Sequence, residues 1–347
     1  MFTGCYTALV TPMKGEGASA VNFKALQMLV EFQIASGVSG LLAMGTTGES
    51  STLNWEEHSE VILKIKDFSR DRCKVIAGTG SNCTSESMNS VRHVAKHGLD
   101  AILLVEPYYN GPSSIEIRRE YMGPIAAAFP QIEVIPYVIP SRTGTQLLPE
   151  DLALLHRQHK NVNAVKEASG SLENMRRTRA CCGRTFQILS GDDDRTAEMM
   201  LDERIGACGV ISVASNVAPA AVQQMTEAFL EGRLDEGRAL QEALKPLFEI
   251  VTVKTQEPSP WGERLCKARN PLPIKTLMAV LGMPVGPCRQ PLGKMTRRGI
   301  EVVLGAARKI WQNNPEILEP VGRAFEVDIK ERLSSPAAAE GLCYEDE

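Results

Sequence analysis

The sequence predicts an α/β protein, a (β/α)8 TIM barrel followed by a small C-terminal helical domain. Eight short apolar, β-branched runs recur at regular intervals along the first part of the chain. Segments with helical periodicity separate these runs, as repeated strand-plus-helix units require. Eight units within about 230 residues are what a closed barrel needs. An open, doubly wound sheet is the alternative, because the sequence alone does not show whether the sheet closes.

Each predicted strand is a run of three to six residues that ends near a polar or glycine-rich segment. The helical pattern between strands is clearest in Asn22–Ser36, where apolar residues are spaced by three and four and Gly37 ends the helix. The predicted strands are Tyr6–Val10, Gly40–Met44, Lys74–Ala77, Ala101–Val105, Glu133–Val138, Ala164–Lys166, Phe186–Leu189 and Gly209–Ser212.

The strand pattern ends near Leu230, which divides the chain into a barrel (1–230), a helical domain (231–313) and a C-terminal extension (314–347). Lys254–Asn270 is polar, with two prolines and a glycine, and is expected to be an ordered surface loop or insertion. The last 14 or so residues, Ser334–Glu347, have little to bury and are expected to be disordered. Helices are predicted over Leu234–Val251, Leu272–Leu281 and Gly299–Asn313.

Composition excludes several classes of function. The 347 residues carry a formal net charge of −4, which argues against a nucleic-acid or anionic-membrane partner, since both require excess basic residues. No apolar run approaches the ~20 residues that span a bilayer, and Met1–Cys5 has no signal-peptide pattern. The nine cysteines have no metal-site spacing and fit a reducing compartment. We therefore expect a soluble cytoplasmic protein.

Polar residues gather where the predicted strands end, which in a barrel is where function resides. These segments are Gly45–Ser50, Gly78–Asn82, Pro107–Asn110, Tyr137 with Pro140–Gly144, Lys166–Glu167, Gly191–Asp193 and Gly209–Ser212.

Lys166 is the most informative of these residues. A lysine at the end of a buried strand is costly unless it has a partner or a chemical role. Burial lowers the pKa of an amine and makes it a nucleophile that can form a Schiff base with a carbonyl substrate. The alternative is a structural ion pair with a neighbour such as Glu167.

The segment Gly45–Ser50 offers hydroxyls and backbone N–H groups that suit a small anion such as a carboxylate. It lacks the Gly-Lys-Ser/Thr ending of a Walker loop. Gly78-Thr79-Gly80 does not complete a dinucleotide fingerprint either, because Cys83 occupies the third glycine position. A tight turn with a helix cap remains the alternative for both segments.

The remaining polar residues have alternatives too. Tyr109 and Tyr137 could relay protons or be half-buried aromatics. Arg142 could bind a carboxylate bidentately or lie at the surface. The acidic run Asp192–Asp194 more often caps a helix than binds a metal.

Taken in order, these segments resemble the dihydrodipicolinate synthase (4-hydroxy-tetrahydrodipicolinate synthase) family, in the class I aldolase superfamily that includes N-acetylneuraminate lyase. The resemblance is carried by Gly45–Ser50, Pro107–Asn110, Tyr137 with Pro140–Gly144, Lys166–Gly170, Ser190–Asp193 and Gly209–Ser212. It runs from Met1 to about Leu230 and more loosely through Asn270–Lys275.

The resemblance implies a lyase that condenses pyruvate with L-aspartate 4-semialdehyde, the committed step of lysine and diaminopimelate synthesis, without a metal or organic cofactor. Lys166 matches the Schiff-base lysine, and Thr46 and Thr47 match the pair that holds the pyruvate carboxylate. Tyr137, Thr46 and Tyr109 match a proton relay, with Tyr109 reaching in from a neighbouring subunit of a homotetramer, a dimer of dimers. Arg142 matches the residue that receives the semialdehyde carboxylate, and Gly191 and Ile211 match pocket-lining positions.

The resemblance also implies an allosteric site for the inhibitor L-lysine. Glu86 can pair with the lysine ammonium, and Trp55 and His58 can cover its aliphatic stem. The alternative is that the aromatic residues belong only to an interface. The matching positions are Ser51, Trp55, His58, Asn82, Glu86 and Tyr108.

The sequence departs from the family pattern at several places. Val138 stands where the family usually has Asn, which should affect the packing outside the barrel more than the pocket. Gly191–Gly209 and Val251–Asn270 are longer than usual. Two other functions remain open: a sister aldolase acting on N-acetylneuraminate or a 2-keto-3-deoxy acid, and a silent binding protein. Arg142 favours a short carboxylated aldehyde, and an intact Lys166 argues against a silent protein.

Overall fold

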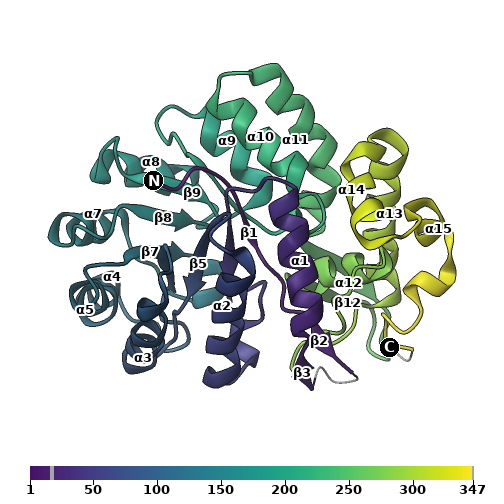
Figure 1. Cartoon of the computed structure of the whole chain (residues 1–347), viewed down its shortest axis with the longest axis horizontal. Helices are drawn as coiled ribbons and strands as arrows, with labels where there is room; N and C mark the ends of the chain where they lie inside the picture. Colours follow the sequence, from purple (N-terminus) through teal and green to yellow (C-terminus); the bar gives the residue numbers. More distant parts are fainter. Residues whose placement is uncertain (16–18, 346–347) are drawn as a thin grey trace.

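The computed structural model describes residues 1–15 and 19–345, and eight parallel strands in them close into a barrel (Figure 1). Strand β1 pairs with both β10 and β4, so the sheet has no edge. This closure confirms the predicted barrel and excludes the open sheet. The barrel strands are β1 (Gly4–Ala8), β4 (Gly40–Ala43), β5 (Lys74–Gly78), β6 (Ala101–Val105), β7 (Glu133–Val138), β8 (Ala164–Glu167), β9 (Gln187–Ser190) and β10 (Gly209–Ser212).

Side chains alternate between the barrel interior and the surrounding helices. Tyr137 and Lys166 are register partners on β7 and β8, and Tyr137 belongs to the cluster that fills the barrel. Their neighbours on the strands, Val138 and Glu167, point the opposite way. Val138 packs in the core between strands and helices, so the unusual residue at this position lies outside the pocket, as predicted.

The helices that surround the barrel begin and end at recognisable residues. The side chain of Asn22 accepts a hydrogen bond from Ala25 N at 3.2 Å and starts α1, and Gly37 follows its end with φ of +79°. The helices are α1 (Phe23–Ala35), α2 (Trp55–Ser69), α3 (Thr84–Val94), α4 (Ser114–Glu116), α5 (Gly123–Ala128), α6 (Pro140–Thr143), α7 (Pro149–Gln158), α8 (Leu172–Cys182), α9 (Thr196–Leu201) and α10 (Pro219–Leu230). A short antiparallel pair, β2 (Met13–Lys14) and β3 (Ala20–Val21), precedes α1.

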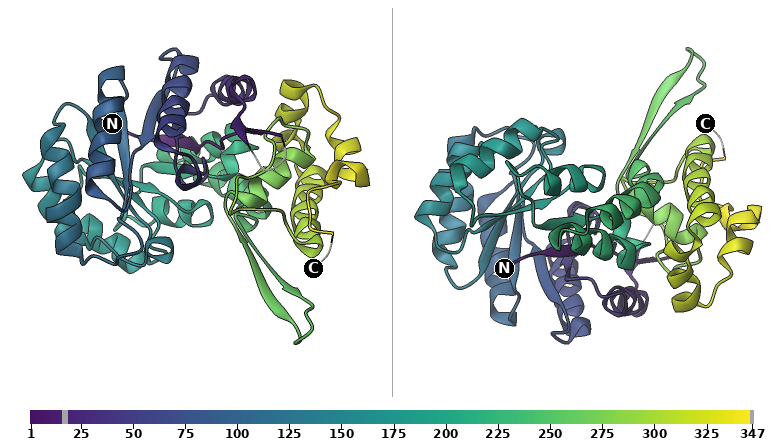
Figure 2. Two further views of the ribbon diagram at one scale, coloured as in Figure 1. Left: turned by 90° about the horizontal axis from the view of Figure 1, so that it is seen from below. Right: turned by 90° about the horizontal axis from the view of Figure 1, so that it is seen from above.

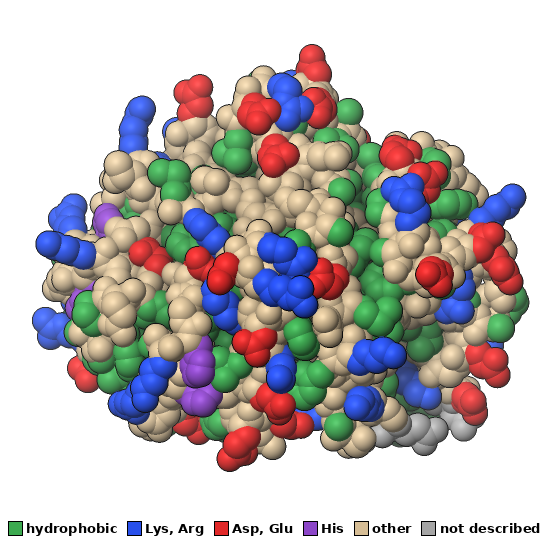
Figure 3. All heavy atoms as spheres, in the orientation of Figure 1, with side chains coloured by type: hydrophobic (Ala, Val, Ile, Leu, Met, Phe, Trp, Pro, Cys, Tyr) green, Lys and Arg blue, Asp and Glu red, His purple; other side chains and the backbone are tan. Residues whose placement is uncertain are grey.

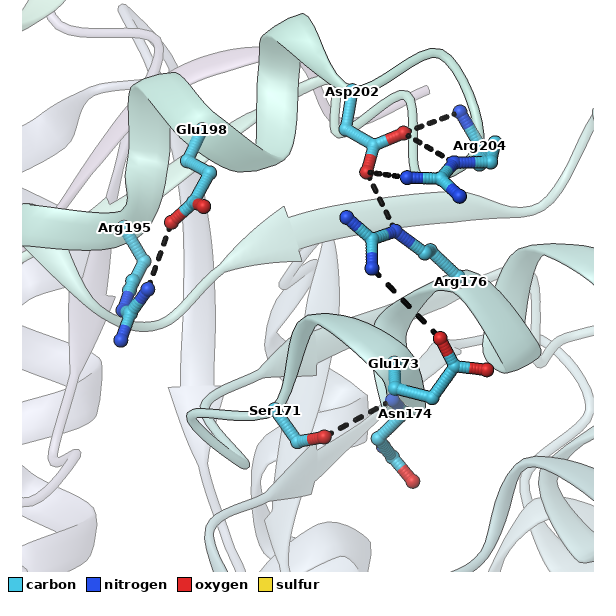
Figure 4. Close-up of polar contacts among 8 residues, drawn as sticks. All are labelled: Ser171, Glu173, Asn174, Arg176, Arg195, Glu198, Asp202 and Arg204. Carbon is cyan, nitrogen blue, oxygen red and sulfur yellow. Dashed lines mark hydrogen bonds and ion pairs between the residues drawn. The ribbon is translucent and has the colours of Figure 1, made fainter.

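Polar contacts tie α8 to the segment that follows α9 (Figure 4). Asp202 accepts from Arg176 Nε at 2.7 Å and from Arg204 Nε at 3.2 Å, and these contacts lower the pKa of Asp202 to about 2. The Ser171 hydroxyl caps α8 by accepting from Asn174 N at 3.2 Å. Asp202 therefore forms ion pairs with both arginines and links two neighbouring strand–helix units.

The C-terminal helices form the second part of the molecule, beside α1 in Figure 1. Phe325 packs edge-on against Phe32 of α1, with ring centroids 5.3 Å apart. Arg332 donates to the carbonyl of Val280 at 2.7 Å and closes the end of α12. These helices are α11 (Leu234–Glu249), α12 (Leu272–Val280), α13 (Arg297–Asn313), α14 (Glu319–Phe325) and α15 (Ile329–Ser334).

The C-terminal extension is folded as far as Glu345, which corrects the expected disorder of the last residues. A 3-10 turn spans Pro336–Ala339, and Ala338 is buried. Met295 N donates to Leu342 O at 3.2 Å and Tyr344 N donates to Met295 O at 3.1 Å. These contacts join residues far apart in sequence, so local composition did not indicate them. Asp346 and Glu347 lie outside the described residues.

The expected surface loop at Lys254–Asn270 is an antiparallel hairpin, β11 (Thr252–Glu257) paired with β12 (Arg264–Arg269). Figure 2 shows this hairpin standing out from the body of the protein. The prediction that strands end near Leu230 is therefore wrong, because β11 and β12 follow that residue. Most of the hairpin's side chains are polar, so it lacks the apolar alternation by which a half-buried strand is recognised.

The surface mixes both signs of charge. Basic and acidic side chains are interspersed over the face in Figure 3, as a formal net charge of −4 allows. Among the described residues, no helix combines the length and apolar character needed to cross a membrane.

Candidate active site

A cavity of about 170 Å³ opens at the C-terminal ends of the barrel strands. It brings together residues from five strand ends, the hairpin and the segments that flank the hairpin. Its lining residues are Thr46, Thr47, Tyr137, Ile139, Ser141, Arg142, Lys166, Gly191, Asp192, Val213, Val251, Thr252, Lys267, Arg269 and Asn270.

Lys166 lies in this cavity with only 5% of its surface exposed. Burial lowers the pKa of its amine to about 8, and the nearby carboxylates of Asp192 and Asp193 oppose the shift. The alternative of an ion pair with Glu167 is wrong, because Glu167 instead accepts from Ser169 N at 2.8 Å and Asn174 Nδ2 at 3.2 Å. Lys166 is therefore a buried amine with a substantial neutral fraction near pH 8.

Tyr137 and Gly191 border the amine directly. Nζ of Lys166 lies 4.2 Å from the centre of the Tyr137 ring. Burial raises the pKa of Tyr137, and a hydrogen bond with the Thr46 side chain partly offsets this effect. A Cβ at Gly191 would lie 3.1 Å from Cε of Lys166 and 2.8 Å from Cβ of Ala168. Glycine at this position therefore leaves room beside the amine.

The turn that carries Thr46 and Thr47 is fixed from behind by a buried ion pair. Glu49, at φ of +62°, accepts from Lys275 Nζ at 2.6 Å and from Arg289 N at 2.7 Å. Thr47 Oγ1 accepts from Asn270 Nδ2 at 3.0 Å. The helical domain thus holds the turn in place, with both threonines facing the cavity.

Asn270 is itself a polar group that the sequence analysis did not single out. Its side chain is buried, and its Oδ1 has no hydrogen-bond partner among the described residues. A buried acceptor without a partner is costly. Because Asn270 lines the cavity, a bound ligand with an N–H or O–H group could satisfy it.

Arg142 sits at the mouth of the cavity, on a segment organised by Glu106. The fully buried Glu106 carboxylate accepts from Ile139 N at 2.9 Å, Thr143 Oγ1 at 3.1 Å and Leu147 N at 2.6 Å. Burial raises the pKa of Glu106 to about 7. The sequence analysis missed Glu106, although a lone acid directly after the buried strand Ala101–Val105 was a usable signal.

The acidic run divides into two roles. Asp193 accepts from Val213 N at 2.8 Å and Ala214 N at 3.1 Å, so it organises the turn after β10. Asp192 faces the cavity, and burial raises its pKa to about 6. Among the described residues, no cluster of three His, Cys, Asp or Glu side chains could hold a metal ion.

Two predicted site residues do not line the cavity. Ile211 is buried in the barrel interior with Tyr137, whereas Val213 reaches the cavity. Tyr109 is 89% exposed and adopts φ of +82°, which is unusual for a residue with a side chain. In the single chain, Tyr109 has no role in the cavity.

A second cavity, of about 350 Å³, adjoins the first and shares Thr46, Ile139 and Arg142 with it. Glu86 accepts from the Ser81 hydroxyl at 2.5 Å in its wall. Five of the six predicted allosteric residues line it, whereas Asn82 lies beside the lining residue Ser81. The five are Ser51, Trp55, His58, Glu86 and Tyr108.

His58 has an unsatisfied atom at this second cavity. It is 2% exposed, and its Nδ1 lacks a partner among the described residues. Burial lowers the pKa of His58 to about 4, so the ring is neutral at neutral pH. The ring packs against Trp55 with centroids 5.0 Å apart.

Comparison with known proteins gives one consistent result. The family model described as "Dihydrodipicolinate synthetase family" matches residues 1–303. The chain is 39% identical over 313 residues to a 4-hydroxy-tetrahydrodipicolinate synthase from Syntrophus aciditrophicus, covering 90% of this chain and 98% of that protein.

Solved structures agree in fold. A lysine-bound synthase from Cyanidioschyzon merolae is 34% identical with a TM-score of 0.80, and the match covers 89% of this chain and 98% of that one. A chloride-inhibited synthase from Acinetobacter baumannii, complexed with pyruvate, is 31% identical with a TM-score of 0.80, covering 89% and 99%.

Proposed function

The chain belongs to the dihydrodipicolinate synthetase family, and we propose that it condenses pyruvate with L-aspartate 4-semialdehyde to 4-hydroxy-tetrahydrodipicolinate, with Lys166 as the covalent nucleophile. The observation that carries the assignment is the buried amine of Lys166, beside Tyr137 and facing the Thr46–Thr47 turn. The comparisons do not favour a sister aldolase or a silent binding protein.

The residues of the cavity suit each step of this condensation. The Lys166 amine attacks the keto carbon of pyruvate, and water leaves as the Schiff base forms. Loss of a methyl proton makes an enamine, whose carbon adds to the semialdehyde carbonyl. The amino group of the semialdehyde then displaces Lys166 from the former keto carbon and closes the ring.

The other side chains position the reactants and move protons. Thr46 and Thr47 would hold the pyruvate carboxylate, while Arg142 would receive the carboxylate of the semialdehyde. Tyr137 and Thr46 would carry protons, with Tyr109 from a neighbouring subunit completing the relay. Gly191 leaves space beside the Lys166 side chain.

A direct assay tests the reaction. Purified protein mixed with pyruvate and L-aspartate 4-semialdehyde should form 4-hydroxy-tetrahydrodipicolinate, followed by a coupled reductase or by mass spectrometry. Incubation with N-acetylneuraminate in a parallel reaction should release no pyruvate. Cleavage of N-acetylneuraminate without condensation would overturn the proposed function.

Formation of the pyruvate adduct should depend on pH with a midpoint near 8. Only the neutral amine attacks, so below the Lys166 pKa of about 8 the rate should fall about tenfold per pH unit. The measurement is the rate of adduct trapping with cyanoborohydride between pH 6 and 9, followed by intact-protein mass spectrometry.

The variant Asp192→Asn provides the matched control for this profile. The Asp192 carboxylate raises the pKa of Lys166, so its removal should move the midpoint to lower pH. An unchanged midpoint in Asp192→Asn, or a rate independent of pH, would contradict the electrostatic account.

We also infer that L-lysine inhibits the enzyme by binding in the second cavity. The Glu86 carboxylate would pair with an ammonium group. The buried Nδ1 of His58 has no hydrogen-bond partner among the described residues, and a ligand could supply one. Because the two cavities share Thr46 and Arg142, lysine there would act on residues that bind substrate. This shared wall supports coupling between the sites.

The variant Glu86→Gln should weaken lysine inhibition. Loss of a charged partner should raise the half-inhibitory lysine concentration roughly tenfold or more. Glu60→Gln, a change of the same kind on α2, should leave that concentration unchanged. Turnover measured without lysine controls for general damage. Inhibition of equal strength in wild type and Glu86→Gln would contradict the assignment.

Assembly and location complete the proposal. We expect a homotetramer, a dimer of dimers, as the family resemblance implies. A contribution of Tyr109 to a neighbouring relay requires at least a dimer. The nine cysteines are all free, which supports a reducing, cytoplasmic location.

A further inference from the structure

The base of the β11–β12 hairpin contributes two cations to the wall of the catalytic cavity. Lys267 and Arg269 both line it, next to Arg142. They are two residues apart on β12, so the pleat directs both to one face of the strand. The base of the hairpin is therefore part of the wall of the catalytic cavity, although its tip is exposed.

Several contacts hold the base of the hairpin in this place. Arg269 Nη1 donates to the carbonyl of Ser141 at 3.3 Å, and Arg142 Nη2 donates to the carbonyl of Asn270 at 3.2 Å. The two hydrogen bonds cross between the hairpin and the segment that carries Arg142. Val253, on the other strand, is buried in the main core.

None of the three cations has a carboxylate partner in the part of the chain that the structure describes. Within residues 1–15 and 19–345, none of them forms an ion pair within 4.0 Å. The cations repel one another: the Arg269 charge lowers the pKa of Lys267, and burial, with a smaller contribution from the Arg269 charge, lowers the pKa of Arg142. Asp192 is the single acid among the described lining residues. An anion from outside would relieve this repulsion.

We propose that Lys267 and Arg269 complete, with Arg142, a carboxylate-binding site at the mouth of the cavity, which makes the enzyme selective for aldehydes that carry a distal carboxylate. This inference rests on the proposed function and extends it. Arg142 supplies the clamp that the family resemblance implies, and the hairpin adds the other two cations. A guanidinium suits this role because it donates two parallel hydrogen bonds to a carboxylate.

Kinetics of matched variants test the site. Arg269→Gln should raise the KM for L-aspartate 4-semialdehyde about tenfold, and Lys267→Gln should raise it less, because an ammonium lacks the bidentate geometry. The KM for pyruvate should stay unchanged in both. Arg264→Gln, at the far end of the same strand, is the control and should behave as wild type. Circular dichroism and thermal midpoints verify folding.

Inhibition by two simple aldehydes tests whether the hairpin cations recognise the carboxylate of the substrate. 4-Oxobutanoate keeps the aldehyde and the distal carboxylate, whereas butanal lacks the charge. The concentration of 4-oxobutanoate that halves turnover should rise in Arg269→Gln, and that of butanal should not. The proposed site would be overturned if the half-inhibitory concentration of 4-oxobutanoate were the same in wild type and both variants. It would also be overturned if Arg264→Gln raised that concentration as much as Arg269→Gln does.

Borohydride trapping of pyruvate on wild-type Lys166 distinguishes failure of the proposed function from failure of the hairpin site. If the adduct forms while the variants keep the wild-type KM for the semialdehyde, only the hairpin site is wrong. A missing adduct would overturn the proposed function, and the hairpin site with it.

Discussion

Replacing Lys166 by alanine should lower turnover by at least about 10³-fold, the order of loss expected when a covalent nucleophile is removed. The amine lies 4.2 Å from the centre of the Tyr137 ring and is 5% exposed. Steady-state assays with pyruvate and L-aspartate 4-semialdehyde measure the loss. Borohydride reduction in the presence of pyruvate should add one pyruvyl group to wild-type Lys166 and none to Lys166→Ala.

The variant Lys166→Arg tests whether the site needs a nucleophilic amine or only a positive charge. The guanidinium keeps the positive charge but remains protonated at the working pH, so it cannot attack pyruvate. This variant should be as inactive as Lys166→Ala. Lys160→Ala, outside the cavity, should retain wild-type turnover and adduct formation. Full turnover in Lys166→Ala, or a pyruvyl group on another lysine, would contradict the mechanism.

The barrel was predictable because its signals are local. Strands such as Ala101–Val105 and Glu133–Val138 match their predicted bounds, since a buried parallel strand is an apolar run. Lys166 stood out for a related reason: a charged residue at the end of such a run is rare without a role. Its relation to Glu167 required the structure, because the partners of Glu167, Ser169 N and Asn174 Nδ2, depend on how the segment after the strand folds.

The hairpin and the C-terminal extension were less predictable because their stability depends on distant partners. The base of the hairpin is held by contacts to Ser141 and to the main core, which its own polar sequence does not indicate. The extension pairs its backbone with Met295. Glu106 has the same difficulty, because its three donors come from Ile139–Leu147, some 33 to 41 positions along the chain.

Tyr109→Phe should lower turnover about 10²-fold, as loss of a proton-relay hydroxyl does, while adduct formation on Lys166 persists. In the single chain, Tyr109 is 89% exposed at φ of +82°. Such strain is stable only where the surroundings impose it, and it often marks a functional position. We therefore expect its hydroxyl to act in the cavity of a neighbouring subunit. Tyr344→Phe, which removes a hydroxyl from the C-terminal extension, is the control and should leave turnover unchanged.

Mixing two inactive variants tests whether that contribution comes from a second chain. In a hybrid of Tyr109→Phe and Lys166→Ala subunits, one cavity combines an intact Lys166 with an intact Tyr109 from the partner. Subunit exchange should therefore restore part of the wild-type turnover, up to about one half of that of a wild-type dimer for each hybrid dimer. Native mass spectrometry verifies that hybrids form. Hybrids that form but do not restore turnover would contradict the shared relay. Each chain would then have to build its relay from its own Tyr109.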